Sequence, residues 1–261
     1  MPASEYMTGA ATAWPLLAGF LCVAARLGSC LVLIPIPGFR TAPMMAKAGL
    51  LAAISVAAYP LLDGRFVAPA SFGAMVLLLA SEMAVGLAAG AIIGLLNEIF
   101  SFAMQSLAMQ AGYAYASAID PNTQADSGVL MVIAQFAAHL LFFATGLHLV
   151  VFRAFARSLE RIPPGRLTVD LGDGVRLVEL GGAMLEFGVR LALPVMGVLL
   201  LTDLALALLG RMQPNLQLLT LIFPVKMLGA LILLAALAPA LPRLYRSAAQ
   251  PAMEVLERLL R

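Results

Sequence analysis

The stretch FGAMVLLLASEMAVGLAAGAIIGLLN, residues 72–97, contains a single charged side chain, Glu82. A helix over this stretch, rising about 1.5 Å per residue, would exceed the ~30 Å hydrocarbon core of a bilayer. Lipid offers the backbone no hydrogen-bond partners, and a helix satisfies its backbone groups internally. The stretch therefore predicts a membrane-spanning helix.

The composition extends this prediction to the whole chain. Of the 261 residues, 62% are hydrophobic and 11% are charged, against roughly 45–50% and 25% in soluble domains. A soluble fold of this size cannot bury so much apolar surface. The net charge of +2 is too small to indicate a polyanionic partner such as a nucleic acid. We therefore expect an all-α membrane protein, and not a soluble enzyme or a nucleic-acid binder.

Five further stretches have the length and apolarity of membrane spans. They are Trp14–Pro35, Met44–Leu62, Val129–Phe152, Met184–Leu209 and Leu218–Leu241. A seventh stretch, Ile99–Ile119, is uncharged but rich in Ala, Ser and Gln. It is compatible with a span, a re-entrant hairpin or a helix buried against protein. We expect one integral-membrane unit, residues 1–261, of about six apolar helices, and no cleavable signal peptide, since residues 1–13 lack Lys and Arg.

The sixteen Lys and Arg residues are distributed unevenly. Four lie within spans, two lie on one face of the six-span arrangement, and ten lie on the other. The ten are Arg65, Arg153, Arg157, Arg161, Arg166, Arg176, Arg243, Arg246, Arg258 and Arg261. Cytoplasmic segments have the excess of Lys and Arg. We therefore expect a cytoplasmic basic loop at 153–183 and a cytoplasmic amphipathic tail at 243–261. That tail would lie on the membrane surface or against a partner, and the side of the N-terminus stays open.

Seven charged side chains lie inside the predicted spans, where each must face protein or water. They are Arg26, Lys47, Glu82, Glu186, Arg190, Asp203 and Lys226. Glu186 and Arg190 are four residues apart, so we expect them to pair on one helix face. The near balance of signs favours structural pairs that join helices, and an ion or proton relay is the alternative.

Glycines recur at every fourth position in Gly86, Gly90 and Gly94. This tandem GxxxG removes side chains from one helix face and lets another backbone approach closely. We expect the third span to pack tightly against a neighbour, in this chain or in another subunit. Prolines at 60, 194, 224 and 239 are expected to interrupt or kink helices, and two of them flank the polar turn at 210–217.

Motifs of known catalytic sites are absent from the sequence, including the Walker A loop, HExxH and GxSxG. His139 and His148 are nine residues apart and point to opposite helix faces, so they cannot share a metal. Cys22 and Cys30 would lie about 12 Å apart along a helix, too far for a disulfide. We expect neither an enzyme nor a metal or cofactor site.

The segment AGYAYASAIDPNTQADSG, residues 111–128, has no positive charge and turns at Asp120-Pro121-Asn122. It is either an ordinary extracytoplasmic loop or a loop packed in protein.

Two segments resemble a known family. One is Met109–Gly112 followed by Ala118–Pro121, and the other runs from Asp203 through Leu208–Pro214 to Phe223–Gly229. In this order among the spans, they resemble the FliR family of flagellar type III export-gate subunits, which is related to the T subunit of injectisomes. The family tends to have Pro-Gln-x-Asn at the turn, where this chain has Pro-Asn-Leu-Gln at 214–217.

The resemblance implies a fold like a fused FliP-like and FliQ-like unit in the bacterial inner membrane, within the flagellar basal body. It implies a ring with FliP-like and FliQ-like subunits, near an FlhB-like protein, through which unfolded export substrates pass without a cofactor in this chain. It also implies that the loop after the third span plugs the closed pore. The implied plug residues are Gly112, Tyr113, Tyr115, Asp120, Pro121 and Asn122. The implied turn motif is Gly210, Arg211, Pro214, Asn215, Pro224 and Lys226.

Three other interpretations remain. The T subunit of an injectisome is one, although the Asp120-Pro121 pair favours the flagellar branch. A secondary transporter that uses Glu82, Asp203 and the basic spans is another. A scaffold with no pore role is the third.

Overall fold

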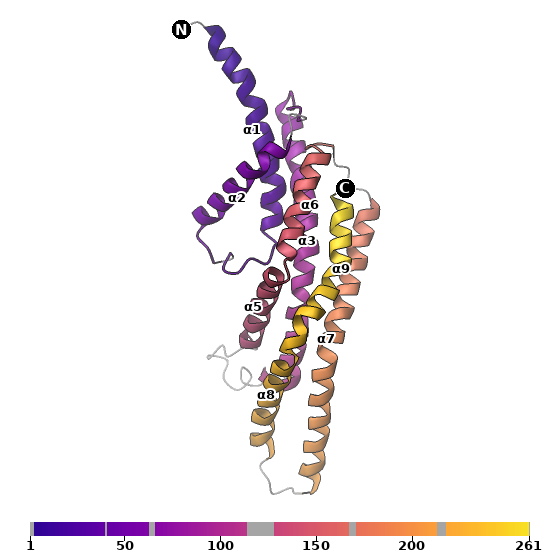
Figure 1. Ribbon diagram of the computed structural model, residues 1–261. Coiled ribbons are helices and arrows are strands. Elements are labelled where there is room, and N and C mark those ends of the chain that lie inside the picture. The colour runs from indigo at the N-terminus through magenta and orange to yellow at the C-terminus, as the bar shows by residue number, and fades with distance from the viewer. Residues whose placement is uncertain are drawn as a thin grey trace. The chain divides into compact units, whose positions relative to one another are not determined.

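The computed structural model describes residues 3–39, 41–62, 66–113, 128–166, 171–212 and 218–260, and all regular elements within these ranges are helices (Figure 1). In chain order they are α1 (Ala3–Leu31), α2 (Met44–Ala58), η1 (Tyr59–Leu62), α3 (Phe72–Ala111), α5 (Gly128–Ala144), α6 (Leu147–Arg161), α7 (Leu171–Met212), α8 (Leu218–Leu237), η3 (Ala238–Ala240) and α9 (Leu241–Leu259). The expected all-α membrane architecture is confirmed.

Five helical segments among the described residues are long and apolar enough to cross a membrane. They are Trp14–Leu31, Met44–Leu62, Phe72–Ala111, Gly174–Met212 and Pro224–Leu259. A sixth results if α5 and α6 together form one broken span. The expected number of about six agrees with this result.

Helix α3 is longer than the sequence predicts. It has 40 residues, which at about 1.5 Å per residue is twice the ~30 Å hydrocarbon thickness. It runs without a break from Phe72 through the first half of the ambiguous stretch Ile99–Ile119. Ile99, Phe100 and Ala103 are buried, so this part of α3 is a helix packed against protein.

The expected span Val129–Phe152 is not one straight helix. Helix α5 ends at Ala144 and α6 begins at Leu147. Between them Gly146 has a φ of 76°, in the left-handed region that glycine adopts at little cost. Hydropathy measures apolar content and is insensitive to such a backbone break.

The segment 153–183 is largely helical and not a loop. Helix α6 continues to Arg161 and α7 begins at Leu171, well before the predicted start at Met184. The charges that suggested a loop lie on exposed helix faces, as at Arg153 and Arg157. Polar residues shorten a span predicted from hydropathy, but they do not end a helix.

The prolines act in two ways. Pro60 and Pro239 lie in the short 3₁₀ turns η1 and η3. Helices α7 and α8 contain Pro194 and Pro224 and continue through them.

The chain packs into two compact units, each made from separate segments. Unit 1 comprises Met1–Gly94, Gly146–Leu180 and Gln250–Arg261, and unit 2 comprises Leu95–Thr145 and Gly181–Ala249. In unit 1, α1 packs against α2 and η1, and a cluster of Ala18, Cys22 and Met75 is buried. Both cysteines, Cys22 and Cys30, are buried and free.

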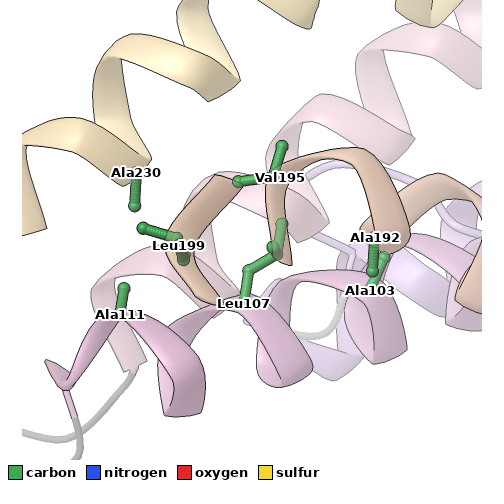
Figure 2. Packing of buried hydrophobic residues seen from close by; sticks show 7 residues of the cluster. All are labelled: Ala103, Leu107, Ala111, Ala192, Val195, Leu199 and Ala230. Carbon is green, nitrogen blue, oxygen red and sulfur yellow. The ribbon is translucent and has the colours of Figure 1, made fainter. Parts of the chain in front are cut away.

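Unit 2 is built on small and branched side chains from three helices (Figure 2). Helix α3 contributes Ala103, Leu107 and Ala111, α7 contributes Ala192, Val195 and Leu199, and α8 contributes Ala230. Alanines at the contact let helix backbones approach closely. This packing aligns the polar groups at the end of α3 with those of α7 and α8.

The tail helix α9 buries its apolar face within this chain. Ala252 and Leu256 are fully buried, and Leu259 and Leu260 nearly so. This differs from the expectation that the tail lies on the membrane surface or against another subunit, because the chain itself covers those side chains.

Candidate functional site

In unit 2 the structure joins the two segments on which the family resemblance rests. The Gln110 side-chain amide near the end of α3 donates a hydrogen bond to the Asp203 carboxylate of α7, over 3.1 Å. Lys226 of α8 forms an ion pair with the same carboxylate, with Nζ 2.8 Å from Oδ1. One carboxylate therefore connects three helices.

The start of the predicted plug is fixed beside this cluster. Gly112 has a φ of 86° and ends α3 in the left-handed conformation that glycine favours at helix C-termini. The Tyr113 hydroxyl then donates a hydrogen bond to the Met227 carbonyl of α8 over 3.2 Å. The chain leaves α3 from an anchored point, one residue after Ala111, which belongs to the same buried cluster as Leu199 and Ala230 (Figure 2).

The remaining predicted plug residues, Tyr115, Asp120, Pro121 and Asn122, lie outside the described residues. The same is true of Pro214 and Asn215 in the turn motif. Gly210 and Arg211 form the end of α7, and Arg211 is exposed.

Unit 1 contains a second polar cluster, centred on a buried ion pair. Arg26 of α1 and Glu82 of α3 are 0% and 1% exposed, with Nε 2.5 Å from Oε2. Arg26 Nη1 also donates to the Ser158 hydroxyl of α6 over 3.0 Å. These contacts offset part of the cost of removing both charges from water, and Arg26 Nη2 is buried without a hydrogen-bond partner among the described residues.

The second oxygen of Glu82 reaches the connection after α6. The Gly165 backbone N–H donates to Glu82 Oε1 over 2.9 Å. Gly165 has a φ of 86°, and a Cβ added there would lie 2.7 Å from Leu78. The connection therefore needs glycine at this position for two independent reasons.

The tandem glycines of α3 lie against α1 in the same chain. A Cβ added to Gly86 would overlap the Ser29 hydroxyl and the Arg26 carbonyl oxygen, and one added to Gly90 would lie 2.9 Å from the Cys30 carbonyl oxygen. Gly94 has more room, at 3.6 Å from the Leu33 carbonyl oxygen. The close approach brings Arg26 within reach of Glu82, four residues before Gly86.

Glu186 and Arg190 form the expected i,i+4 ion pair on α7, but they are not buried in this chain. Their side chains are 63% and 72% exposed. Leu185, Val189 and Leu193 are exposed around them. The sequence predicts that each charge within a span faces protein or water, and among the described residues none covers this face of α7. Lys47 of α2 is half-buried and lies 5.5 Å from the centre of the Phe39 ring.

A groove of about 400 Å³ with both polar and apolar lining is present in unit 2. Its polar lining comprises Glu98, Ser101 and Gln105 of α3 and Gln135 of α5, beside Gly181 of α7. The buried Ser101 hydroxyl makes no hydrogen bond within the described chain. The rest of the lining is apolar and comes from Leu95, Ile99, Phe102, Met184 and Leu185.

Sequence reasoning missed Ser158 and Gly165 in the unit 1 cluster. Ser158 resembles any small helix residue, and only the Pro-Pro-Gly sequence at 163–165 marked an unusual connection. Gln110 was quoted only as part of a family motif, without a partner. No group of three or more His, Cys, Asp or Glu side chains able to hold a metal is found among the described residues.

Comparison with known proteins gives one family. The model that describes "Bacterial export proteins, family 1" matches residues 17–251. The chain is 29% identical to the "Flagellar biosynthetic protein FliR" of Escherichia coli K12, over 87% of this chain and 83% of that protein. It is 26% identical to the protein of the same name from Caulobacter vibrioides, over 88% and 91% of the two chains. With the Bacillus subtilis protein of that name it is also 26% identical, over 84% and 85%.

Proposed function

Because this chain belongs to the bacterial export proteins, family 1, and its resemblance to the FliR family is confirmed, we propose that it is a structural and gating subunit of the flagellar protein export gate. In this proposal it completes a ring with FliP-like and FliQ-like membrane subunits, near an FlhB-like protein, in the bacterial inner membrane. The loop that begins at Gly112 plugs the closed pore, and unfolded flagellar proteins pass when the plug moves. The protein has a structural role in this export apparatus, and the energy for transport comes from other components.

The exposed pair Glu186–Arg190 is the observation that favours assembly with other subunits. Both charges are largely exposed, with the exposed apolar side chains of Leu185, Val189 and Leu193 around them, and lipid is a poor environment for charged groups. A neighbouring subunit with polar groups, or a water-filled passage, would solvate them. The groove at Glu98 and Gln135 supports the same interpretation, because the buried Ser101 hydroxyl in it has no hydrogen-bond partner among the described residues.

The anchor at Gly112 and Tyr113 supports the plug. A loop that closes a pore needs a fixed start so that it returns to the same place. The hydrogen bond to the Met227 carbonyl and the ion pair of the adjacent Lys226 with Asp203 supply such a start. The loop itself lies outside the described residues, so its position in the pore rests on the family resemblance.

Assembly is tested by expressing the chain with the FliP-like and FliQ-like proteins of the same bacterium. A tag on this chain should retain both proteins through size-exclusion chromatography. The double change Glu186→Leu and Arg190→Leu should reduce their retention, whereas the matched pair Val175→Leu and Val178→Leu at exposed positions nearer the start of α7 should not. Retention of neither protein by the unchanged chain would contradict the proposal.

Two alternatives are distinguished by other results. The three relatives reported above are named flagellar proteins, which favours the flagellar branch over an injectisome subunit. Restored motility in a strain that lacks its own copy would support this choice. A secondary transporter would show saturable solute uptake by the purified chain alone, and the pairing of Glu82 and Asp203 with Arg26 and Lys226 favours structural roles for these charges.

A further inference from the structure

Helix α6 has two chemically distinct faces. Its buried side includes Leu147, Val151, Ala154, Phe155, Ser158 and Leu159. The opposite side is exposed and begins with the apolar side chains of Leu149 and Phe152. It continues with Arg153, Arg157 and Arg161, all exposed. The exposed face therefore changes from apolar to cationic along the helix.

The arginines form a row because of their spacing. Positions separated by four residues lie on the same side of a helix, about 6 Å apart along the axis. Arg166, also exposed, follows in the connection after α6. We refer to Arg153, Arg157 and Arg161 as the arginine row.

Two contacts in unit 1 hold this face outward. Ser158, on the buried side of α6, accepts a hydrogen bond from the buried Arg26 guanidinium. Just beyond the helix, the Gly165 N–H is bound to Glu82. The rotation of α6 about its axis is therefore fixed by the same buried ion pair that joins α1 and α3.

Two carboxylates lie near the arginine row, and among the described residues neither forms an ion pair with it. Glu160 is on α6 itself, and Glu257 of α9 lines a small cavity of about 120 Å³ with Arg157 and Arg161. With Arg166 included, the cations exceed the anions. A free cationic face remains at the point where the apolar surface ends.

We propose that the arginine row binds the phosphate groups of anionic phospholipids, with Leu149 and Phe152 in the adjoining acyl region. A guanidinium presents paired N–H donors that match the phosphate oxygens. The change from apolar to cationic side chains along one helix face matches the change from hydrocarbon to headgroup in a leaflet. An acidic protein surface could bind the arginines alone and would not account for the exposed apolar side chains of Leu149 and Phe152 beside them. The inference is independent of the export function, because it needs only a membrane beside α6.

The test uses the full chain in nanodiscs with a single tryptophan reporter. Trp14→Phe removes the native tryptophan, and Phe152→Trp places one at the boundary of the apolar half and the arginine row. Fluorescence quenching by brominated phosphatidylglycerol is compared with quenching by brominated phosphatidylcholine. The ratio of the two lipid association constants measures the headgroup preference.

We expect the ratio to favour phosphatidylglycerol, and to fall by roughly fivefold or more in the triple change Arg153→Gln, Arg157→Gln and Arg161→Gln at low salt. The control removes the same charge from α9 by Arg243→Gln, Arg246→Gln and Arg258→Gln, and should retain most of the preference. Lysines at the three α6 positions keep the positive charge, so this variant should retain the greater part of the preference for phosphatidylglycerol.

Three outcomes would overturn the proposal. One is equal quenching by both lipids in the chain with the native row. The second is an equal loss in the α6 and α9 triple variants, which would indicate a general charge effect. The third is an unchanged lipid ratio in the α6 variant together with loss of a copurifying protein, which would assign the row to an acidic protein surface. The lysine variant separates any of these results from a failure to fold.

Discussion

Gln110 and Asp203 are 93 residues apart in the sequence, and the Gln110 amide donates a hydrogen bond to the Asp203 carboxylate. The same carboxylate is paired with Lys226. The contact places the two segments that resemble the FliR family in one cluster, beside the point where the predicted plug begins. Its consequences for stability and gating can be measured separately.

The Asp203–Lys226 pair is expected to be structural. Asp203→Asn leaves Lys226, which is largely buried, without its counter-ion. Because the Asp203 side chain is 39% exposed, solvent screens part of the loss, and we expect a cost of roughly 1–3 kcal/mol. Thermal unfolding of the purified chain in detergent measures it. The exchanged pair Asp203→Lys with Lys226→Asp should recover motility, whereas failure of the exchange together with normal stability would favour a proton relay.

The plug role can be tested by shortening the loop while keeping the contact that anchors its start. Residues 114–126 should be replaced by a brief Gly-Ser link, with Gly112 and Tyr113 kept so that the hydrogen bond to Met227 survives. The assembled gate should then leak small ions, because loops tolerate change better than packed helices. Membrane conductance in cells that make the full gate checks this. An assembled gate that stays as tight as the unchanged one would return the segment to the ordinary-loop interpretation.

Glycine substitutions on α3 should have opposite effects at two positions. Gly86→Ala places a methyl group against the Arg26 carbonyl and the Ser29 hydroxyl, so it should separate α1 from α3 and lower the melting temperature. Gly73→Ala, on the same helix, meets nothing within 4 Å. It should be neutral or stabilising by roughly 0.5–1 kcal/mol, since alanine favours helix more than glycine does. Equal effects at both positions would mean that the close approach of α1 is not required.

The Arg26–Glu82 pair should behave as a coupled unit. Glu82→Gln leaves a fully buried guanidinium without its counter-ion, which typically costs about 3–5 kcal/mol. The double change Arg26→Met and Glu82→Leu should be less destabilising than either single change. Melting of the four variants gives the coupling energy, and strictly additive effects would show that the two side chains act independently.

The ten-to-two distribution of Lys and Arg predicts that α6 lies on the cytoplasmic side. Gly165 is unsuitable for a probe, because its φ of 86° and the nearby Leu78 would strain any side chain. Glu160 is exposed, and Glu160→Cys should react only with reagents that enter the cell. Both native cysteines are buried, so background labelling at Cys22 and Cys30 should be low. Labelling by an impermeant reagent from outside would contradict the predicted cytoplasmic placement of α6.

The sequence by itself determined the class of the protein, the approximate number of apolar helices and the family. Apolar content and span length are local properties, and a helix in lipid must satisfy its own backbone, so Phe72–Asn97 could be read as helix without a partner. The i,i+4 pairing of Glu186 and Arg190 is equally local, because one helix fixes both side chains. The GxxxG at Gly86 and Gly90 predicted a close neighbour for the same reason, although not which one.

Only the tertiary structure decided which distant groups meet. That Arg26 pairs with Glu82 and reaches Ser158, and that Gln110 meets Asp203, depends on how helices far apart in sequence rotate and pack against each other. The break at Gly146 depends on a backbone angle that hydropathy does not register. The tertiary structure also decides exposure, because a charge on an apolar helix is buried or exposed according to what covers that helix face. This is why Glu82 and Glu186, both acidic residues in apolar helices, have opposite environments.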